Sequence, residues 1–278
     1  MLYFSLPNFY ENIEFNKELA RIISEHPDMV NDDIRPCRIE SCYGNFPYSF
    51  WNGDVSTNCG DNRAVLYDEA VEIQKLHWTP VTLDCSNIAM IETDFLNYHL
   101  EMILDVFSKV GNTIKISNLS LMEYINSKYT GYYFILSKNT DMINSFENHI
   151  NSLIEENGFD YIEIPDYWSE EIIKGIKNKN KVLITLDNKC RHCSRDQQCE
   201  CKVYENINQI SYSNVSVLND CVNTSISVKE EFDNYRKLGF THFQFQTPSS
   251  YEILGFKQKL LDFFIKPEYH RTFIERMK

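Results

Sequence analysis

Short apolar runs recur along the chain, and most are followed by a segment in which apolar residues have helical spacing. Most of the runs are bounded by Asn, Asp, Pro or Ser, as is typical of strands that are covered on both faces. The candidate strands are Tyr3–Leu6, Val81–Cys85, Ile114–Ser117, Tyr132–Leu136, Tyr161–Ile164, Val182–Leu186 and His242–Phe245.

Three helical patterns between these strands end at a glycine, and a strand follows within a few residues. The patterns span 95–107, 146–154 and 228–238, and the glycines are Gly111, Gly158 and Gly239. A glycine after the last apolar position is a common helix stop, because it adopts the left-handed backbone that ends many helices. Strands that alternate with helices in this way indicate successive βα units and a parallel sheet.

Eight such units would close a (β/α)₈ barrel of the TIM type, and we predict this fold for a single domain over 1–278. Seven strands are visible, and we expect the eighth near Ile210–Val217. The interval before Val81 predicts a long insertion between the first strand and the first helix, with an aromatic loop at 36–63. A doubly wound open sheet is the alternative, although no Gly-rich phosphate turn follows any of the strands.

Composition narrows the class of protein. The 278 residues are 43% hydrophobic, which is enough for a sizeable core, and the formal net charge is −13. A chain this acidic lacks a general electrostatic attraction for nucleic acid or an anionic bilayer, so we expect neither as a partner. No apolar stretch approaches the roughly 20 residues of a membrane span. The segment 1–7 lacks the features of a secretory signal, and we expect a cytoplasmic protein.

Polar residues stand where the predicted strands end, and a TIM barrel places its active site at the carboxyl ends of its strands. They are Asp84, Asn118, Ser137, Lys138, Asn139, Glu163, Asp187, Asn188, Gln244 and Gln246. The competing explanation for any one of them is ordinary turn chemistry. Glu163 and Gln244 lie within strand runs, where a buried polar group needs a partner.

We therefore predict a small-molecule site at this end of the barrel. Glu163 is the candidate general base, and Asp84 is the second candidate catalytic residue. The candidate substrate-binding residues on strand ends are Asn118, Ser137, Lys138, Gln244 and Gln246. Tyr43 and Trp51, in an aromatic stretch that follows the first strand, join them as parts of a lid over the barrel mouth. The alternative for that stretch is a hydrophobic plug.

The most specific feature is a cysteine-rich segment at 187–221, directly after the strand that we count as the sixth. It contains Cys190, Cys193, Cys199, Cys201 and Cys221. A two-residue gap such as that between Cys190 and Cys193 lets two thiolates converge on one metal ion or cluster.

Three interpretations stay open for these cysteines. The first is a [4Fe–4S] cluster on Cys190, Cys193, Cys199 and Cys221, with Cys201 as the alternative to Cys199. The second is a structural zinc ion on the four cysteines from Cys190 to Cys201, and the third is a set of unliganded thiols. Spacing alone does not separate zinc from an iron–sulfur cluster.

A barrel chain with irregularly spaced cysteines at this position resembles the peptidase U32 family, collagenase-like in name. The short stretches that carry the resemblance are Phe4-Ser5-Leu6-Pro7, Ile116-Ser117-Asn118-Leu119, Phe134-Ile135-Leu136-Ser137-Lys138-Asn139 and Asp187-Asn188-Lys189-Cys190. Members of that family include oxygen-independent hydroxylases with a four-cysteine [4Fe–4S] site.

The resemblance implies a TIM-barrel redox or hydroxylation enzyme for a small-molecule or nucleobase substrate, served by a redox partner. It also implies cluster ligands at Cys190, Cys193, Cys199 and Cys221. We do not expect peptidase activity, because no nucleophile or zinc-protease motif is present. The alternative is a non-catalytic binding or scaffold protein whose zinc ion only holds a loop together.

Overall fold

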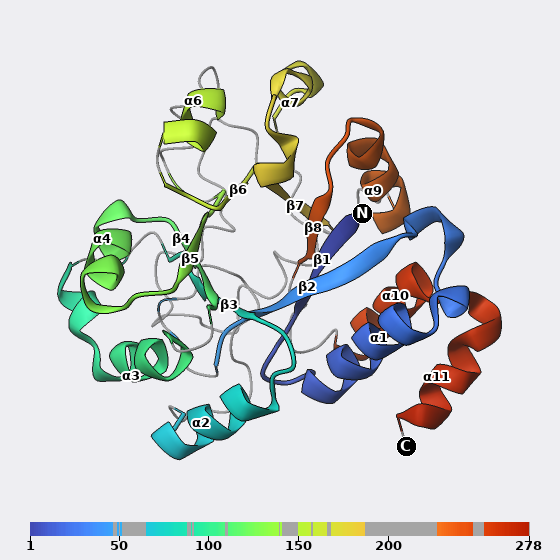
Figure 1. Ribbon diagram of the computed structural model, residues 1–278, viewed down its shortest axis with the longest axis horizontal. Helices are drawn as coiled ribbons and strands as arrows, with labels where there is room; N and C mark the ends of the chain where they lie inside the picture. Colours follow the sequence, from blue (N-terminus) through green and yellow to red (C-terminus); the bar gives the residue numbers. More distant parts are fainter. Residues whose placement is uncertain are drawn as a thin grey trace, which may run out of the picture.

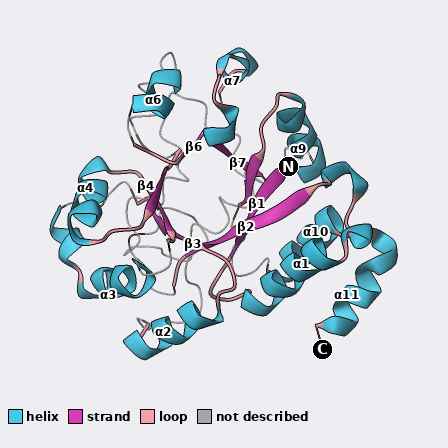
Figure 2. Cartoon of the chain, viewed as in Figure 1, coloured by secondary structure: helices cyan, strands magenta, loops and turns pink. Residues whose placement is uncertain are grey.

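Eight parallel strands pair in sequence order and close into a barrel in the computed structural model of the chain, with helices around the outside (Figures 1 and 2). The structure describes residues 1–46, 49, 51, 65–87, 90, 92–108, 111–138, 140, 150–156, 158–165, 168–186, 227–246 and 253–277. The predicted (β/α)₈ fold is confirmed.

The strands are β1 (Leu2–Pro7), β2 (Cys37–Gly44), β3 (Val81–Cys85), β4 (Thr113–Ile116), β5 (Tyr133–Leu136), β6 (Tyr161–Glu163), β7 (Val182–Leu186) and β8 (His242–Phe245). The helices are α1 (Ile13–Glu25), α2 (Tyr67–Leu76), α3 (Tyr98–Phe107), α4 (Leu119–Lys128), α6 (Ile150–Glu156), α7 (Glu170–Gly175), α9 (Val228–Lys237), α10 (Ile253–Phe264) and α11 (His270–Arg276). β8 pairs with β1 and so closes the barrel.

The sequence pattern missed one strand, β2, and misplaced an insertion. Helix α1 follows β1 within a few residues, so the expected long insertion between the first strand and the first helix is wrong. Cys37–Gly44, at the start of the expected loop 36–63, forms β2 instead. The strand that ends before the cysteine-rich segment is therefore the seventh, not the sixth. The expected eighth strand near Ile210–Val217 lies outside the described residues, and the barrel closes without it.

The helix boundaries follow from their capping residues. Gly239 follows the C-cap residue of α9, Leu238, with a φ of +95°, and its amide donates to the carbonyl of Arg236 at 2.9 Å. This left-handed stop is the one that the sequence predicts. Asn97 caps the start of α3 by accepting from the amide of His99 at 2.9 Å. No helix in the described part of the chain has the length and apolar character needed to cross a bilayer.

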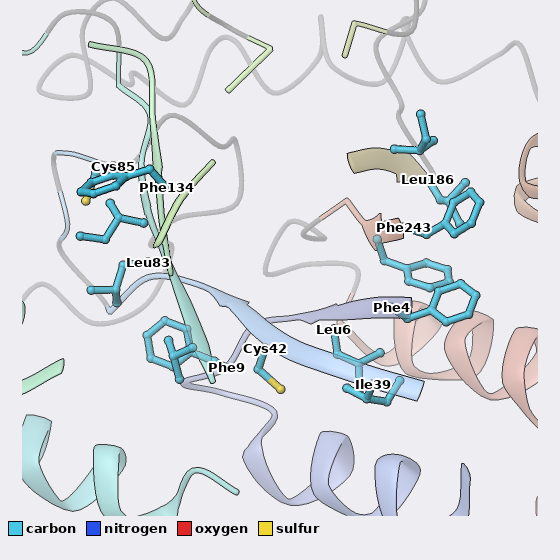
Figure 3. Packing of buried hydrophobic residues seen from close by; sticks show 14 of the residues in the cluster. Phe4, Leu6, Phe9, Ile39, Cys42, Leu83, Cys85, Phe134, Leu186 and Phe243 are labelled. Atoms are coloured by element: carbon cyan, nitrogen blue, oxygen red, sulfur yellow. The ribbon is translucent and has the colours of Figure 1, made fainter. Parts of the chain in front are cut away.

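The hydrophobic core lies between the strands and the surrounding helices. Phe4 of β1 packs against Phe243 of β8 with 5.6 Å between ring centroids (Figure 3). Phe264 of α10 meets the edge of Phe4 at 5.0 Å. All three side chains are fully buried, and aromatic rings of this size contribute much of the burial that stabilises a domain.

The inside of the barrel is unusually polar, because successive residues on a strand point to opposite faces. On β1, for example, Phe4 points outward to the helices and Ser5 points inward, where its hydroxyl lies 2.7 Å from that of Ser41. Thr82 adds a third hydroxyl, 3.4 Å from Ser41. TIM barrels usually fill this space with branched apolar side chains. Here the interior instead carries the groups that form the candidate site.

Candidate active site

Three charged side chains from three strands meet inside the barrel. The Nζ atom of Lys115, on β4, lies 2.8 Å from Oδ2 of Asp84 on β3 and 3.8 Å from Oε2 of Glu163 on β6. The exposed fraction of each side chain is 2% or less. Because β4 and β6 are not neighbours in the sheet, Lys115 and Glu163 can meet only across the interior. Each residue is the last or next-to-last of its strand, so the group lies at the carboxyl end of the barrel.

Glu163 is held by hydrogen-bond donors on both of its carboxylate oxygens. Its Oε1 accepts from the hydroxyl of Thr185, on β7, and from Nε2 of Gln244, on β8, at 3.0 Å. Its Oε2 accepts from the backbone amide of Lys138 at 3.3 Å. Gln244 also donates to the Thr185 hydroxyl at 2.9 Å, which completes a triangle around Oε1. The contacts of Oε2 are longer, so this oxygen is the more available of the two.

Asp84 is held on its other side by the residue that follows β3. Its Oδ1 accepts from the amide of Ser86 at 3.0 Å and from the Ser86 hydroxyl at 2.5 Å. This arrangement leaves Oδ2 directed at Lys115. The carboxylate therefore has a fixed orientation before any ligand binds.

The charges of this group balance. Lys138 brings a second ammonium, whose Nζ lies 3.8 Å from Oε1 of Glu163. Two lysines thus face two carboxylates, and all four side chains are largely or fully buried. Moving charges out of water is costly, and apolar side chains of similar volume often serve a core equally well. A barrel that keeps four such groups at its carboxyl end has the composition expected of a catalytic site rather than of a packing core.

Tyr43 closes one side of the site. It belongs to β2, is fully buried, and donates from its hydroxyl to the backbone carbonyl of Phe245, at the end of β8. Lys115 lies with its Nζ 5.5 Å from the centre of the Tyr43 ring, within range of a cation–π contact. Tyr43 is thus a wall of the site within the barrel. Trp51 is buried as well, and its Nε1 donates to Asn45 at 3.1 Å.

The other predicted binding residues have local partners. The Asn118 side chain caps α4 by accepting from the amide of Ser120 at 2.8 Å. Ser137 is fully buried, and its amide donates to the carbonyl of Ile116 at 2.7 Å. The amide of Gln246 donates to Leu186 at 2.8 Å, which continues the pairing of β8 with β7. Of the predicted set, the structure joins Asp84, Glu163, Gln244 and Lys138 in one network and places Tyr43 beside it.

Sequence reasoning missed two members of the network, Lys115 and Thr185. Both lie inside strands that the pattern identifies as apolar runs, and the pattern favours the residues after the strands as site candidates. A signal for Lys115 is present, because the lysine stands between Ile114 and Ile116 in a strand that is covered by helices. A charged residue at such a position needs a partner of opposite charge.

A second polar group occupies the amino end of the barrel. The Tyr161 hydroxyl, on β6, donates to Oε1 of Glu40 at 3.1 Å and lies 3.4 Å from Nε2 of His242. The ring of Tyr3 stacks on that of His242, with 4.7 Å between the centroids. Burial lowers the pKa of His242 to about 4 and raises the pKa of Glu40. His242 is thus neutral near pH 7 and accepts or donates hydrogen bonds as an uncharged ring.

The predicted metal ligands Cys190, Cys193, Cys199, Cys201 and Cys221 lie outside the described residues, as do Asn139, Asp187 and Asn188. Within the described ranges there is no group of three or more His, Cys, Asp or Glu side chains that could hold a metal ion. The described cysteines are free thiols. Burial raises the pKa of Cys42 to about 12 and that of Cys37 to about 11, so neither is a reactive thiolate near neutral pH.

Comparison of the chain with protein-family models, with curated proteins and with solved structures found no match. The fold alone does not define a function, because TIM barrels host many chemistries. What this protein does therefore has to be inferred from the geometry of the site.

Proposed function

We propose that this protein is an enzyme that transfers protons to and from a small carbonyl compound at the carboxyl end of its barrel. The observation that carries the proposal is the fully buried Lys115 between the carboxylates of Asp84 and Glu163. Side chains from separate strands that converge at this end of the barrel are the usual source of catalytic groups in the fold.

Each charged residue has a distinct role in this proposal. Glu163 is the general base, and its Oε2 accepts a proton from the substrate carbon next to the carbonyl group. Lys115 stabilises the negative charge that develops on the carbonyl oxygen, an effect that is large in a water-poor interior. Asp84 fixes the position of Lys115 through the 2.8 Å ion pair. Return of the proton from Glu163 to the same or a neighbouring carbon completes an exchange or an isomerisation.

Solvent exchange tests this function with a panel of compounds, so the substrate need not be identified first. Small carbonyl compounds are incubated with the protein in D₂O, and loss of C–H signal is followed by proton NMR. We expect at least one compound to exchange, and Glu163→Gln to slow its exchange about 100-fold or more. Glu101→Gln is the matched control, because Glu101 is a partly exposed carboxylate paired with Lys128. Exchange that is equally fast in Glu163→Gln and in the wild type would refute the proposed base.

A second candidate is the redox or hydroxylation enzyme with a [4Fe–4S] cluster that the resemblance to the peptidase U32 family implies. One structural observation favours it. Strand β7 ends at Leu186, at the same end of the barrel as the charged network, and the cysteine-rich segment 187–221 follows Leu186 directly in the sequence. A cluster held there would serve a small-molecule substrate in that site, supplied with electrons by a redox partner.

Anaerobic purification with visible absorption and metal analysis tests the second candidate. We expect a brown protein with about four irons per chain, and a colourless one after Cys190→Ala and Cys193→Ala. One zinc ion and no colour would instead support a structural site on the cysteines between Cys190 and Cys201 and remove the cluster. Neither metal under strictly anaerobic conditions would leave proton transfer as the function.

A further inference from the structure

Apart from Oδ2 of Asp84, which faces the ammonium of Lys115 at 2.8 Å, two polar atoms in the charged network have no hydrogen-bond partner. They are Nζ of Lys138, a donor, and Oε1 of Gln244, an acceptor. Lys138 faces Oε1 of Glu163 at 3.8 Å, which is an ion-pair distance beyond hydrogen-bond reach. Both atoms are inaccessible to solvent. An unsatisfied buried polar atom is costly, so each one calls for an explanation, such as an ordered water, an ion or a bound ligand.

The orientation of the Gln244 amide is fixed by chemistry. Its other end faces Oε1 of Glu163 at 3.0 Å, and a carboxylate oxygen can only accept, so the NH₂ group must be the end that faces it. The carbonyl oxygen of Gln244 therefore points elsewhere and awaits a donor. Lys138 and Gln244 both contact the same oxygen of Glu163, which places their unsatisfied atoms beside the proposed base.

A ligand that satisfies both residues must present an acceptor to Lys138 and a donor to Gln244. Charge decides between an anionic and a neutral ligand. Lys115 and Lys138 already balance Asp84 and Glu163. An added anion would leave one buried negative charge without compensation among the described side chains, whereas a neutral ligand keeps the balance.

We propose that Lys138 and Gln244 select a neutral α-hydroxycarbonyl compound. The carbonyl oxygen, whose developing charge Lys115 stabilises in the proposed proton transfer, also accepts from the Lys138 ammonium, and the neighbouring hydroxyl donates to Oε1 of Gln244. The carbon between these groups carries the acidic C–H and lies next to Glu163. This inference rests on the proposed proton-transfer function for the fate of that C–H bond, but the binding that it predicts can be measured independently.

Binding of three small probes to the wild-type protein is the first test. Hydroxyacetone has both groups, acetone lacks the hydroxyl, and lactate replaces the neutral carbonyl with a carboxylate. We expect hydroxyacetone to bind with a Kd about tenfold or more below those of acetone and lactate in ligand-observed NMR titrations. Equal binding of acetone, or tighter binding of lactate, would overturn the proposal, and so would absence of hydroxyacetone binding.

Variants then assign the selectivity to the two residues. Lys138→Met and Gln244→Met should each weaken hydroxyacetone binding about tenfold or more and leave the weak binding of acetone less affected. Lys128→Met and Gln258→Met are the matched controls, because both residues form exposed surface contacts. Circular dichroism and Tm establish that each variant folds, and the wild-type probe comparison stands even if one does not. Hydroxyacetone binding that is unchanged in both folded variants would refute the assignment.

The two proposals can fail separately. Selective binding of hydroxyacetone without C–H exchange in D₂O would contradict the proposed proton transfer and support the binding pair. Exchange that depends on Glu163, seen with an anionic compound and not with hydroxyacetone, would support the proton transfer and contradict the binding pair.

Discussion

Replacement of Lys115 by methionine tests whether the buried charges act as one unit. Methionine keeps most of the side-chain volume and removes the ammonium. The variant therefore retains Asp84 and Glu163 in a site where each is about 1% exposed, without the cation that both face.

The expected loss of stability follows from the distances. At an effective dielectric constant near 20, an ion pair at 2.8 Å contributes about 6 kcal/mol of gross attraction and one at 3.8 Å about 4 kcal/mol. Much of this gross attraction only offsets the free energy that it costs to remove the charges from water. Removal of one partner from such a buried pair typically lowers the free energy of unfolding by about 3–5 kcal/mol, and we expect Lys115→Met to fall in this range.

Urea denaturation followed by circular dichroism measures this loss at pH 7. Addition of Asp84→Asn to Lys115→Met should restore at least about 1 kcal/mol, since it removes the carboxylate that has lost its closest cation. Lys128→Met, at an exposed ion pair, should lower the free energy of unfolding far less than Lys115→Met does.

Two outcomes would refute this reasoning. A loss below about 1 kcal/mol for Lys115→Met would mean that the charges are well solvated despite their burial. A double variant less stable than Lys115→Met itself would mean that Asp84 is held by its contacts with Ser86 rather than by the lysine.

Three further predictions concern stability and reactivity. Burial lowers the pKa of His242 to about 4, against about 6.5 in the unfolded chain, so the unfolded state binds more protons between these pH values and the free energy of unfolding falls as the pH drops from 6.5 to 4. His242→Asn should reduce that fall by about 1–2 kcal/mol, as measured by urea titrations at the two pH values. Asn112 accepts from the amide of Val81 at 2.8 Å and donates to the carbonyl of Phe107 at 2.7 Å, so Asn112→Ala should lower the free energy of unfolding by about 2–4 kcal/mol. A loss as small as that caused by Asn151→Ala, which removes an exposed hydrogen bond to Gly175, would contradict this expectation. Burial raises the pKa of the Cys42 thiol to about 12, so Cys42 should react with iodoacetamide at pH 8 about 100-fold more slowly in the native than in the urea-unfolded protein. Peptide mapping by mass spectrometry measures both rates, and equal rates would contradict the burial of this thiol.

The sequence predicts the barrel because its strands and helix stops are local signals. Apolar runs such as Val182–Leu186 match the observed strands residue for residue, and Gly239 ends a helix as expected. The sequence pattern did not predict strand β2, because polar residues interrupt it. Arg38, Glu40 and Ser41 break the apolar run that identifies the other strands. Ile39 and Cys42, three positions apart, both lie in the apolar core because the pairing of β1 with β2 shifts register between them.

The sequence predicts only part of the candidate site, for a related reason. Glu163 and Gln244 stand out as polar residues within strands, and the structure brings their side chains to 3.0 Å from one another. Lys115 and Thr185 meet the same criterion, since each also stands between two apolar residues, but the pattern favours the polar residues that follow their strands, Asn118 and Asp187, instead. That these four residues meet depends on the relative register and tilt of strands far apart in the sequence, which local patterns do not encode.

The polar interior of the barrel also determines which strand pairing the chain can accept. Strand β6 carries Tyr161 and Glu163 two positions apart, and β8 carries His242 and Gln244 at the same spacing. A slip of either strand by one residue would turn both of its polar side chains into the apolar layer beneath the helices. A slip of β6 would also move Glu163 away from Lys115 and leave Asp84 as the remaining one of its two carboxylates. An interior of leucine and valine would tolerate such a slip far better. The groups proposed for chemistry thus also act against misregistered barrels during folding, so substitutions that remove them should cost the chain part of its structural uniqueness as well as its activity.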